Sequence, residues 1–163
     1  MLTNISSTSH EPQRLAVVDD HAIIRGVFLT LVEDTPGFMM AWMASSLAEA
    51  RDNIRRDAPD FLVMDVGLTD GNGFDFIREI LQLIPALPVL MVSAQEDRTY
   101  PERAMACGAR GFIDKSTSLE LLVEAVSAIQ QGGNWFKSPT LSATAVAADS
   151  MNNEDSTLRQ HST

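Results

Sequence analysis

The sequence predicts an α/β domain in which helices cover both faces of a doubly wound, five-stranded parallel sheet. Five short apolar runs lack polar alternation, which is typical of strands that are buried on both faces. Segments with apolar residues at helical spacing separate these runs, so a strand–helix unit repeats five times. Parallel strands need right-handed crossovers, and these place helices on both sides of the sheet.

The first two strand–helix units are expected within residues 15–59. Leu15–Val18 is the first apolar run and is followed by a helical stripe. This stripe comprises Ile23, Ile24, Val27, Phe28 and Leu31. Phe38 to Ala44 is the second expected strand. Ser46 and Glu49 have the spacing of a capping box for the second helix, and Pro59 ends that helix because proline cannot continue it.

The third and fourth units follow the same order. Phe61–Met64 is the third expected strand, and Gly71–Gly73 is an expected turn. A helical stripe then comprises Phe74, Ile77, Ile80, Leu81 and Ile84. Pro85 ends this helix. Val89–Val92 is the fourth expected strand, and a short helix is expected at 101–107.

The fifth unit begins with the expected strand Gly111–Ile113. Thr117 and Glu120 have the spacing of another capping box. The helix that this box predicts has a stripe of Leu119, Leu122, Val123, Val126 and Ile129. Gly132 and Gly133 are expected to end the helix.

The composition excludes several classes of protein. The 163 residues include 22 acidic and 12 basic side chains, for a formal net charge of −10. Direct binding of nucleic acid is therefore not expected. Cys107 is the only cysteine and the three histidines lie far apart in the sequence, which argues against an intramolecular disulfide and against histidine-rich metal motifs. No signal peptide or membrane span is predicted, so we expect a cytoplasmic protein.

The domain organisation follows from a change of composition along the chain. Residues 14–137 are expected to fold as one domain, after a polar extension at 1–13. Residues 138–163 are rich in Ser and Thr, which predicts a linker or a disordered tail. Nothing after Gly133 shows two amphipathic helices joined by a short turn, so we expect no DNA-binding domain in this chain.

Polar side chains are expected at one edge of the predicted sheet. Asp19 and Asp20 follow the first strand, and Asp65 follows the third. Ser93 follows the fourth strand, and Lys115 comes just after the fifth. Ligands of parallel α/β sheets bind beyond the carboxyl ends of the strands, where these residues would meet. Each position alone has an ordinary explanation as a cap, a turn or a surface charge, but their coincidence at one edge favours a functional site.

This set of side chains points to phosphoryl chemistry. Three clustered carboxylates repel each other unless a cation lies among them, and a site with few carboxylates and room for water suits Mg²⁺. A lysine beside the metal would pair with an anion such as a phosphoryl group. A carboxylate next to Mg²⁺ can itself act as the nucleophile and become an aspartyl phosphate.

The ordered set of motifs resembles the receiver domain of bacterial two-component response regulators. The matching segments are Val17-Val-Asp-Asp-His21, Met64-Asp-Val-Gly-Leu-Thr-Asp-Gly71, Val92-Ser-Ala94 and Gly111-Phe-Ile-Asp-Lys115. The resemblance covers about residues 14–137 and implies a flavodoxin-like strand order of 2-1-3-4-5 with five flanking helices. Residues 108–120 resemble the subfamily that usually continues into a LuxR-type helix-turn-helix domain.

The resemblance implies roles for the residues at the sheet edge. Asp65 would be the phosphoacceptor of a catalytic set that also includes Lys115 and Ser93. Asp19, Asp20 and Asp65 would hold Mg²⁺ together with the backbone carbonyl of Gly67. Lys115 would pair with the phosphoryl oxygens.

A conformational switch is also implied by the resemblance. Ser93 would hydrogen-bond the phosphoryl group, and Phe112 would rotate inward in response. Gly67 and Gln95 stand at positions that tune the lifetime of the phosphoryl group in this family. Ser116 stands where the family often has a proline, which puts the usual cis bond in doubt.

The resemblance also implies partners and an output. The phosphoryl donor would be a sensor histidine kinase, a homodimer is possible, and the output would be transcription through a DNA-binding domain absent from this chain. The chain would not be an enzyme, since it would catalyse only its own phosphorylation and dephosphorylation.

Three alternatives remain open on the sequence. The chain could be a standalone receiver that acts through protein–protein contacts. A phosphatase of the haloacid dehalogenase type would need a second acid two residues after the nucleophile, where this chain has Gly67. A flavodoxin-like protein that binds FMN is disfavoured because Asp19, Asp20 and His21 form a loop that would repel the phosphate.

Overall fold

The computed structural model describes residues 11–136, and its main sheet is parallel. The strands are β1 (Gln13–Val18), β2 (Phe38–Ala44), β3 (Phe61–Asp65), β6 (Val89–Ser93) and β7 (Gly111–Asp114). They lie in the order β2-β1-β3-β6-β7, with every neighbouring pair parallel. Since β6 and β7 are the fourth and fifth strands of this sheet, the predicted order 2-1-3-4-5 is confirmed. The predicted extension and tail lie almost wholly outside the described residues.

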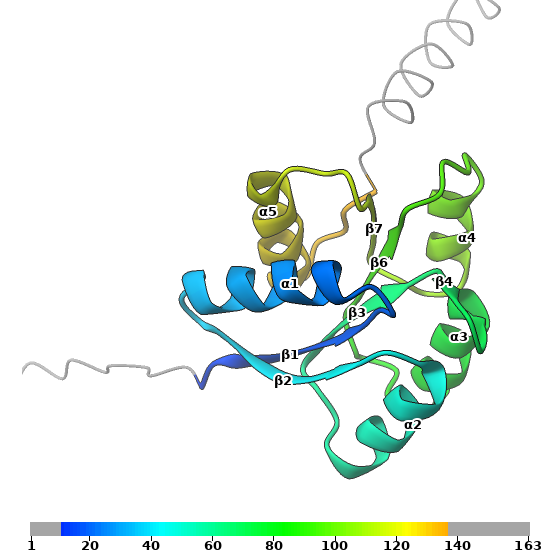
Figure 1. Cartoon of the computed structure of the whole chain (residues 1–163), viewed down its shortest axis with the longest axis horizontal. Helices are drawn as coiled ribbons and strands as arrows, with labels where there is room; N and C mark the ends of the chain where they lie inside the picture. The colour runs from blue at the N-terminus through cyan, green and yellow to red at the C-terminus, as the bar shows by residue number, and fades with distance from the viewer. Residues whose placement is uncertain (1–10, 137–163) are drawn as a thin grey trace, which may run out of the picture.

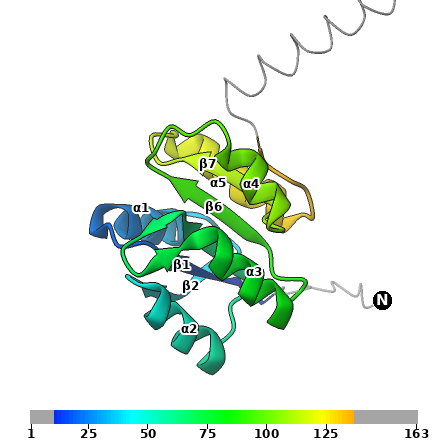
Figure 2. The same cartoon turned by 90° about the vertical axis from the view of Figure 1, so that its right-hand side faces the viewer.

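Five helices cover the two faces of the sheet, as predicted (Figure 1). They are α1 (Ala22–Asp34), α2 (Leu47–Arg56), α3 (Gly73–Leu83), α4 (Tyr100–Ala106) and α5 (Leu119–Gln130). Helices α1 and α5 pack on one face, and α2, α3 and α4 pack on the other (Figure 2). The domain therefore has three layers, which bury the strands on both sides.

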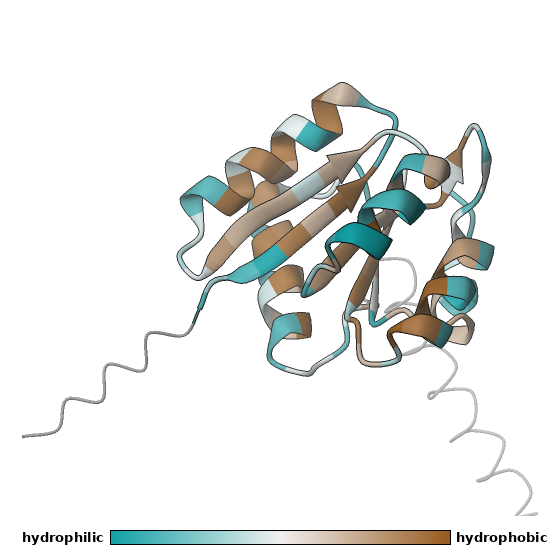
Figure 3. Ribbon diagram, turned by 90° about the horizontal axis from the view of Figure 1, so that it is seen from below, coloured by the Kyte–Doolittle hydropathy of each residue, from teal (hydrophilic) through white to brown (hydrophobic). Residues whose placement is uncertain are grey.

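Alternate residues of each strand feed two separate cores. Leu15 and Val17 of β1 pack with α1 and α5, whereas Ala16 and Val18 pack with the helices of the other face. In the hydropathy view, β1 is teal at its start and mostly brown toward its end, where its last four residues are buried (Figure 3). All five residues of β3, including Asp65 at its end, are buried. The sheet is thus a rigid support for the side chains at its carboxyl edge.

Helix starts agree with the sequence at α2 and differ at α5. Ser46 caps α2, because its side chain accepts a hydrogen bond from Glu49 N. The prediction that Thr117 caps the last helix is wrong. Thr117 N donates to Asp114 O in a turn after β7, so the helix begins one residue later with Ser118 as its cap.

The loop after β3 contains a two-stranded ribbon that the sequence did not predict. Strands β4 (Gly67–Leu68) and β5 (Gly71–Asn72) pair antiparallel. The turn therefore lies between them, two residues earlier than expected, and Gly73 is already the first residue of α3. Among the described peptide bonds none is cis, so the bond before Ser116 is trans.

The segment after α5 returns to the outer edge of the sheet. Trp135 forms a parallel bridge with Gly111 of β7. Trp135 N donates to Arg110 O at 2.8 Å, and Phe112 N donates to Trp135 O at 2.8 Å. No helix within residues 11–136 has both the length and the apolar character required to cross a membrane.

Candidate functional site

Three strand ends bring two carboxylates and an ammonium group together at the carboxyl edge of the sheet. Asp19 follows β1, Asp65 ends β3, and Lys115 follows β7. Lys115 Nζ lies 2.8 Å from Asp19 Oδ2 and 3.0 Å from Asp65 Oδ2. The predicted meeting of these residues is thus present in the structure.

The group is nearly inaccessible to water. Asp19 is fully buried, Asp65 is 2 % exposed, and the Lys115 side chain is 8 % exposed. Burial raises the pKa of Asp65, because a carboxylate loses hydration inside the protein. The hydrogen bond from Lys115 acts in the opposite direction, and the negative charge of Asp19 raises this pKa further. The net effect is a raised pKa for Asp65.

This burial predicts that Asp65→Asn stabilises the fold without divalent cations. Because the folded pKa of Asp65 is raised, its favourable contribution is present below the unfolded pKa of about 3.9 and is lost as pH rises through the folded value. Asparagine carries no charge and avoids this loss. The free energy of unfolding of the variant should therefore exceed that of the wild type by about 1 kcal/mol at neutral pH, and should differ little from it near pH 4. Urea denaturation in EDTA at both pH values measures the difference. Asp75→Asn, at an exposed position of α3, is the control. An equal gain at both pH values would contradict the electrostatic explanation.

Asp20 and His21 complete the cluster on its outer side. Ligand atoms of Asp19, Asp20, His21 and Asp65 all lie within 4.8 Å of one another. The Asp20 side chain is 26 % exposed and that of His21 is 57 % exposed. The site therefore has a buried floor of two carboxylates and a rim that solvent reaches.

The donor atoms of this cluster fit a divalent cation. The buried oxygens Asp19 Oδ2 and Asp20 Oδ1 have side-chain nitrogens as their close polar neighbours among the described residues: Lys115 Nζ lies 2.8 Å from the first and His21 Nδ1 lies 3.0 Å from the second. Lys115 supplies one positive charge to three carboxylates, so the cluster retains negative charge. Carboxylate oxygens with space for water are the usual environment of Mg²⁺. Asp19, Asp20 and Asp65 are therefore able to hold this ion.

The loop after Asp65 is held close to the phosphoacceptor candidate. Gly67 N donates to Asp65 Oδ1 at 3.2 Å. A Cβ atom added at Gly73 would lie 2.5 Å from the backbone oxygen of Asp65, and 3.1 Å from Val66 Cα. Only glycine permits this approach between the start of α3 and the end of β3.

Ser93 and Phe112 both lie close to the site but inside the protein. Ser93 is 2 % exposed, and its Oγ accepts a hydrogen bond from Gln95 N at 3.0 Å. Phe112 is 8 % exposed and packs edge-on against Tyr100, with the ring centres 6.3 Å apart. Tyr100 also donates to Gln95 Oε1 at 2.9 Å. One contact path therefore links Ser93, through Gln95 and Tyr100, to Phe112.

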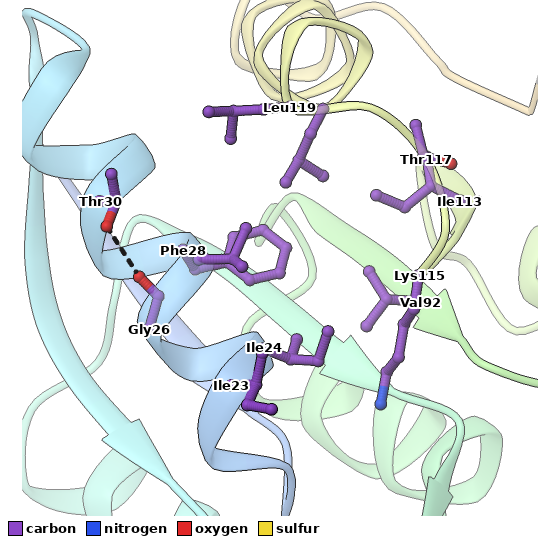
Figure 4. Close-up of a pocket in the computed structure, with 12 residues that line it drawn as sticks. Ile23, Ile24, Gly26, Phe28, Thr30, Val92, Ile113, Lys115, Thr117 and Leu119 are labelled. Carbon is purple, nitrogen blue, oxygen red and sulfur yellow. Dashed lines mark hydrogen bonds between the residues drawn. The ribbon is translucent and has the colours of Figure 1, made fainter.

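An apolar cavity of about 510 Å³ opens beside the charged cluster (Figure 4). Ile24 and Phe28 of α1 line one side, and Leu119 at the start of α5 lines another. Lys115 forms part of the wall, so the cavity and the cluster share this residue. Ile23 is 82 % exposed next to the cavity, which gives this face an apolar rim.

Two residues at the site were not assigned a role from the sequence. The wide separation of the three histidines gave no reason to place His21 in the cluster, because its partners there are carboxylates from two strand ends and not other histidines. Its position directly after two aspartates was the available signal. Tyr100 was missed because its contact with Phe112 joins α4 to β7, and no local pattern indicates such a contact.

Comparison with known proteins places these residues in a family. The model of the response regulator receiver domain matches residues 15–127. The transcriptional regulatory protein DegU of Brevibacillus brevis is 27 % identical over 123 residues, which are 76 % of this chain and 52 % of DegU. The response regulator GacA of Pseudomonas viridiflava is 29 % identical over 123 residues, which are 76 % of this chain and 58 % of GacA. The chain thus spans little more than half the length of these two relatives.

A solved structure shows the same fold. A LuxR-family two-component response regulator from Aurantimonas sp. SI85-9A1 has a TM-score of 0.75 and 31 % sequence identity. The match covers 86 % of this chain and 99 % of that one. The described domain therefore has a structural counterpart of similar length.

Proposed function

Because this chain belongs to the response regulator receiver domain family, we propose that it accepts a phosphoryl group on Asp65 from a sensor histidine kinase. The observation that carries this proposal is the contact of Asp65 Oδ2 with Lys115 Nζ at 3.0 Å, on a carboxylate that the fold buries beside Asp19. The phosphatase alternative is not favoured, because the family is that of receivers and position 67 is a glycine.

The proposed step exchanges one phosphorus bond for another. A carboxylate oxygen of Asp65 attacks the phosphorus of a phosphohistidine, and the phosphorus–nitrogen bond breaks as the imidazole leaves with its electron pair. Lys115 stands against Asp65 and would pair with the phosphoryl oxygens, offsetting the charge that the acidic cluster would otherwise repel. Ser93 would donate a hydrogen bond to the same group.

Asp19, Asp20 and Asp65 would hold Mg²⁺, with the backbone carbonyl of Gly67 as a further ligand. Bound there, the ion would neutralise charge on the phosphoryl oxygens. The residues of the chain supply the position of the nucleophile. Gly67 N holds Asp65 Oδ1, so one carboxylate oxygen is oriented by the loop and the other faces Lys115.

The apolar face beside the cluster supports the proposed kinase partner. Ile23 and Leu119 are 82 % and 46 % exposed, and they border the cavity that includes Lys115. A protein that delivers a phosphoryl group to Asp65 must approach this edge of the sheet, and it could bury this apolar surface there.

The receiver would act in the cytoplasm.

The output would follow from a population shift between two conformations. A phosphoryl group on Asp65 would favour the state in which the Ser93 hydroxyl turns toward it and leaves Gln95 N. The Phe112 side chain would rotate inward in this state, and this rotation would alter the surface formed by α4 and β7. Gly67 and Gln95 would tune the phosphoryl lifetime. DegU is a transcriptional regulatory protein, so the proposed output is transcription through a DNA-binding domain, with a standalone receiver or a homodimer as the further options.

Intact mass spectrometry after incubation with acetyl phosphate and Mg²⁺ tests the proposed phosphoacceptor. We expect one phosphoryl adduct on the wild-type chain and none on Asp65→Asn, because asparagine offers no carboxylate nucleophile. Asp60→Asn is a suitable control, since Asp60 is an exposed residue before β3 and should leave the adduct intact. Absence of the adduct from the wild type with Mg²⁺ present, or its persistence in Asp65→Asn, would contradict the proposal.

A further inference from the structure

A carboxylate from the β4–β5 ribbon caps helix α2 from a distant part of the sequence. Leu47 N donates to Asp70 Oδ1 at 3.0 Å, and Ala48 N donates to Asp70 Oδ2 at 3.1 Å. The first N–H groups of a helix have no partner inside it, and this end of a helix favours negative charge. The two hydrogen bonds lower the pKa of Asp70, so its side chain is ionised at neutral pH and only accepts.

Helix α2 also has a local cap, which serves other N–H groups. Ser46 precedes the helix, and its Oγ accepts a hydrogen bond from Glu49 N at 3.1 Å. Ala50 N donates to Ser46 O at 3.0 Å. Ser46 thus serves the third and fourth N–H groups of α2, and Asp70 serves the first two. Unlike the local cap, Asp70 fastens a separate segment of the chain to the helix.

The ribbon depends on contacts of this kind because it is very short. Strands β4 and β5 have two residues each, and an isolated two-stranded ribbon is marginally stable in water. The turn residues Thr69 and Asp70 are exposed, so burial does little to hold the tip. Leu47 of α2 lies against the ribbon, since a Cβ atom added at Gly71 would be 2.8 Å from Leu47 Cδ1. This apolar contact and the bonds of Asp70 attach the tip to the same turn of α2.

The base of the ribbon holds the proposed phosphoacceptor. Gly67 pairs with Asn72 at the end of the ribbon next to β3, and Gly67 N donates to Asp65 Oδ1 at 3.2 Å. In the proposed function, the backbone carbonyl of Gly67 is also a ligand of Mg²⁺. One further pair of residues separates Gly67 from the turn that α2 holds. A displacement of the turn is therefore transmitted to Gly67.

We propose that Asp70 is a positioning residue for phosphorylation of Asp65, because it fixes the ribbon on α2 and so holds Gly67 at the phosphoacceptor. The inference rests on the proposed function and deepens it by adding a residue outside the acidic cluster. If the ribbon left α2, Gly67 would occupy its present position for only part of the time. The apparent affinity for the cation would fall by the same fraction.

Ser46→Ala is the matched control for Asp70→Ala. Each substitution removes side-chain acceptors from the N-terminus of α2, so both should lower the urea concentration at the midpoint of unfolding. Only Asp70→Ala detaches the ribbon from the helix. Asp70→Asn keeps one acceptor oxygen for the helix and should show a smaller effect than Asp70→Ala on every readout below.

Solvent exchange of backbone amides, measured by nuclear magnetic resonance without metal or phosphoryl donor, tests the anchoring itself. We expect Gly67 N to exchange faster in Asp70→Ala than in the wild type, because its hydrogen bond to Asp65 Oδ1 opens more often. Exchange of Gly67 N should be unchanged in Ser46→Ala. A general loss of stability would instead affect both variants alike.

Calorimetric titration with Mg²⁺ and the acetyl phosphate reaction test the consequence for the site. The Mg²⁺ affinity of Asp70→Ala should fall about tenfold, the lower end of the effect of residues that support metal ligands. Formation of the adduct should slow at limiting Mg²⁺ and recover when Mg²⁺ is in excess. Ser46→Ala should match the wild type in both measurements.

The outcomes distinguish this inference from the proposed function. Unchanged exchange of Gly67 N and unchanged Mg²⁺ affinity in Asp70→Ala, or equal changes in Ser46→Ala, would overturn the role of Asp70 while the wild type still forms its adduct. Absence of the adduct from the wild type would overturn the proposed function, and with it the role of Asp70 in phosphorylation.

Discussion

Lys115→Met is expected to lower the free energy of unfolding by about 3–5 kcal/mol at neutral pH in the absence of divalent cations. Lys115 Nζ contacts the carboxylates of Asp19 and Asp65, which are fully or almost fully buried. Methionine has a similar length but no charge, so the two carboxylates would remain inside the protein without their cation. Removal of one partner from a buried ion pair is much more costly than loss of an exposed pair.

The pH dependence tests this explanation. Lys115 lowers the pKa of Asp65, so its removal should raise that pKa further. A carboxylate with a raised folded pKa stabilises the fold below its unfolded pKa of about 3.9, and this contribution is lost as pH rises. The loss of unfolding free energy in Lys115→Met should therefore become smaller as the pH is lowered from neutral to about 4. Urea denaturation measures both values, and added Mg²⁺ should also reduce the deficit.

Arg78→Met provides the matched control, since Arg78 pairs with Asp75 on the exposed surface of α3. Its effect should stay within about 0.5 kcal/mol. A deficit for Lys115→Met that is equally small, or that does not change with pH, would show that the buried carboxylates do not depend on this ammonium.

Gly73→Ala is expected to destabilise the domain by about 3 kcal/mol and to slow phosphorylation of Asp65. The new Cβ would lie 2.5 Å from Asp65 O and 3.1 Å from Val66 Cα, and neither is part of a flexible side chain. Overpacking against atoms that cannot move aside costs about 1–3 kcal/mol or more. To relieve this clash, either α3 or the end of β3 must shift. A shift of the end of β3 would move the proposed nucleophile Asp65.

Gly26→Ala is the control for this substitution. Gly26 lies within α1, and an added Cβ would meet nothing within 4 Å. Alanine in a helix interior should therefore stabilise the domain, by about 0.5–1 kcal/mol. Denaturation and the acetyl phosphate reaction are measured for both variants. An unchanged stability and rate for Gly73→Ala would show that the close approach of α3 is not required.

The fold was predictable from the sequence because its strands are short, apolar and buried on both sides. The run Phe61–Met64 has no polar alternation, and in the structure β3 is buried at every position. The edge residues were predictable for a related reason. Asp19, Asp65 and Lys115 come where apolar runs end, and parallel strands place such ends side by side.

Features that depend on contacts across the fold were not predictable in the same way. The β4–β5 ribbon has two residues in each strand, too few for a periodic pattern. Thr117 and Ser118 both suit a helix cap, and the hydrogen bond from Thr117 N to Asp114 O selects the second. Tyr100 receives its partner Phe112 from another element, so no local pattern indicated the contact. His21 follows Asp19 and Asp20 directly, but its approach to Asp65 depends on the end of a second strand.

The bridge between Trp135 and Gly111 has a consequence for aggregation. An outer strand with unpaired backbone groups is a template on which further chains can add strands. Here the backbone of Trp135 forms hydrogen bonds with Phe112 N and Arg110 O. These are backbone groups at the outer edge of the sheet that would otherwise be available to another chain. The family match ends at residue 127, inside α5. A fragment cut at that boundary would expose this edge, so its tendency to self-associate would reflect the missing Trp135 and not a natural dimer surface.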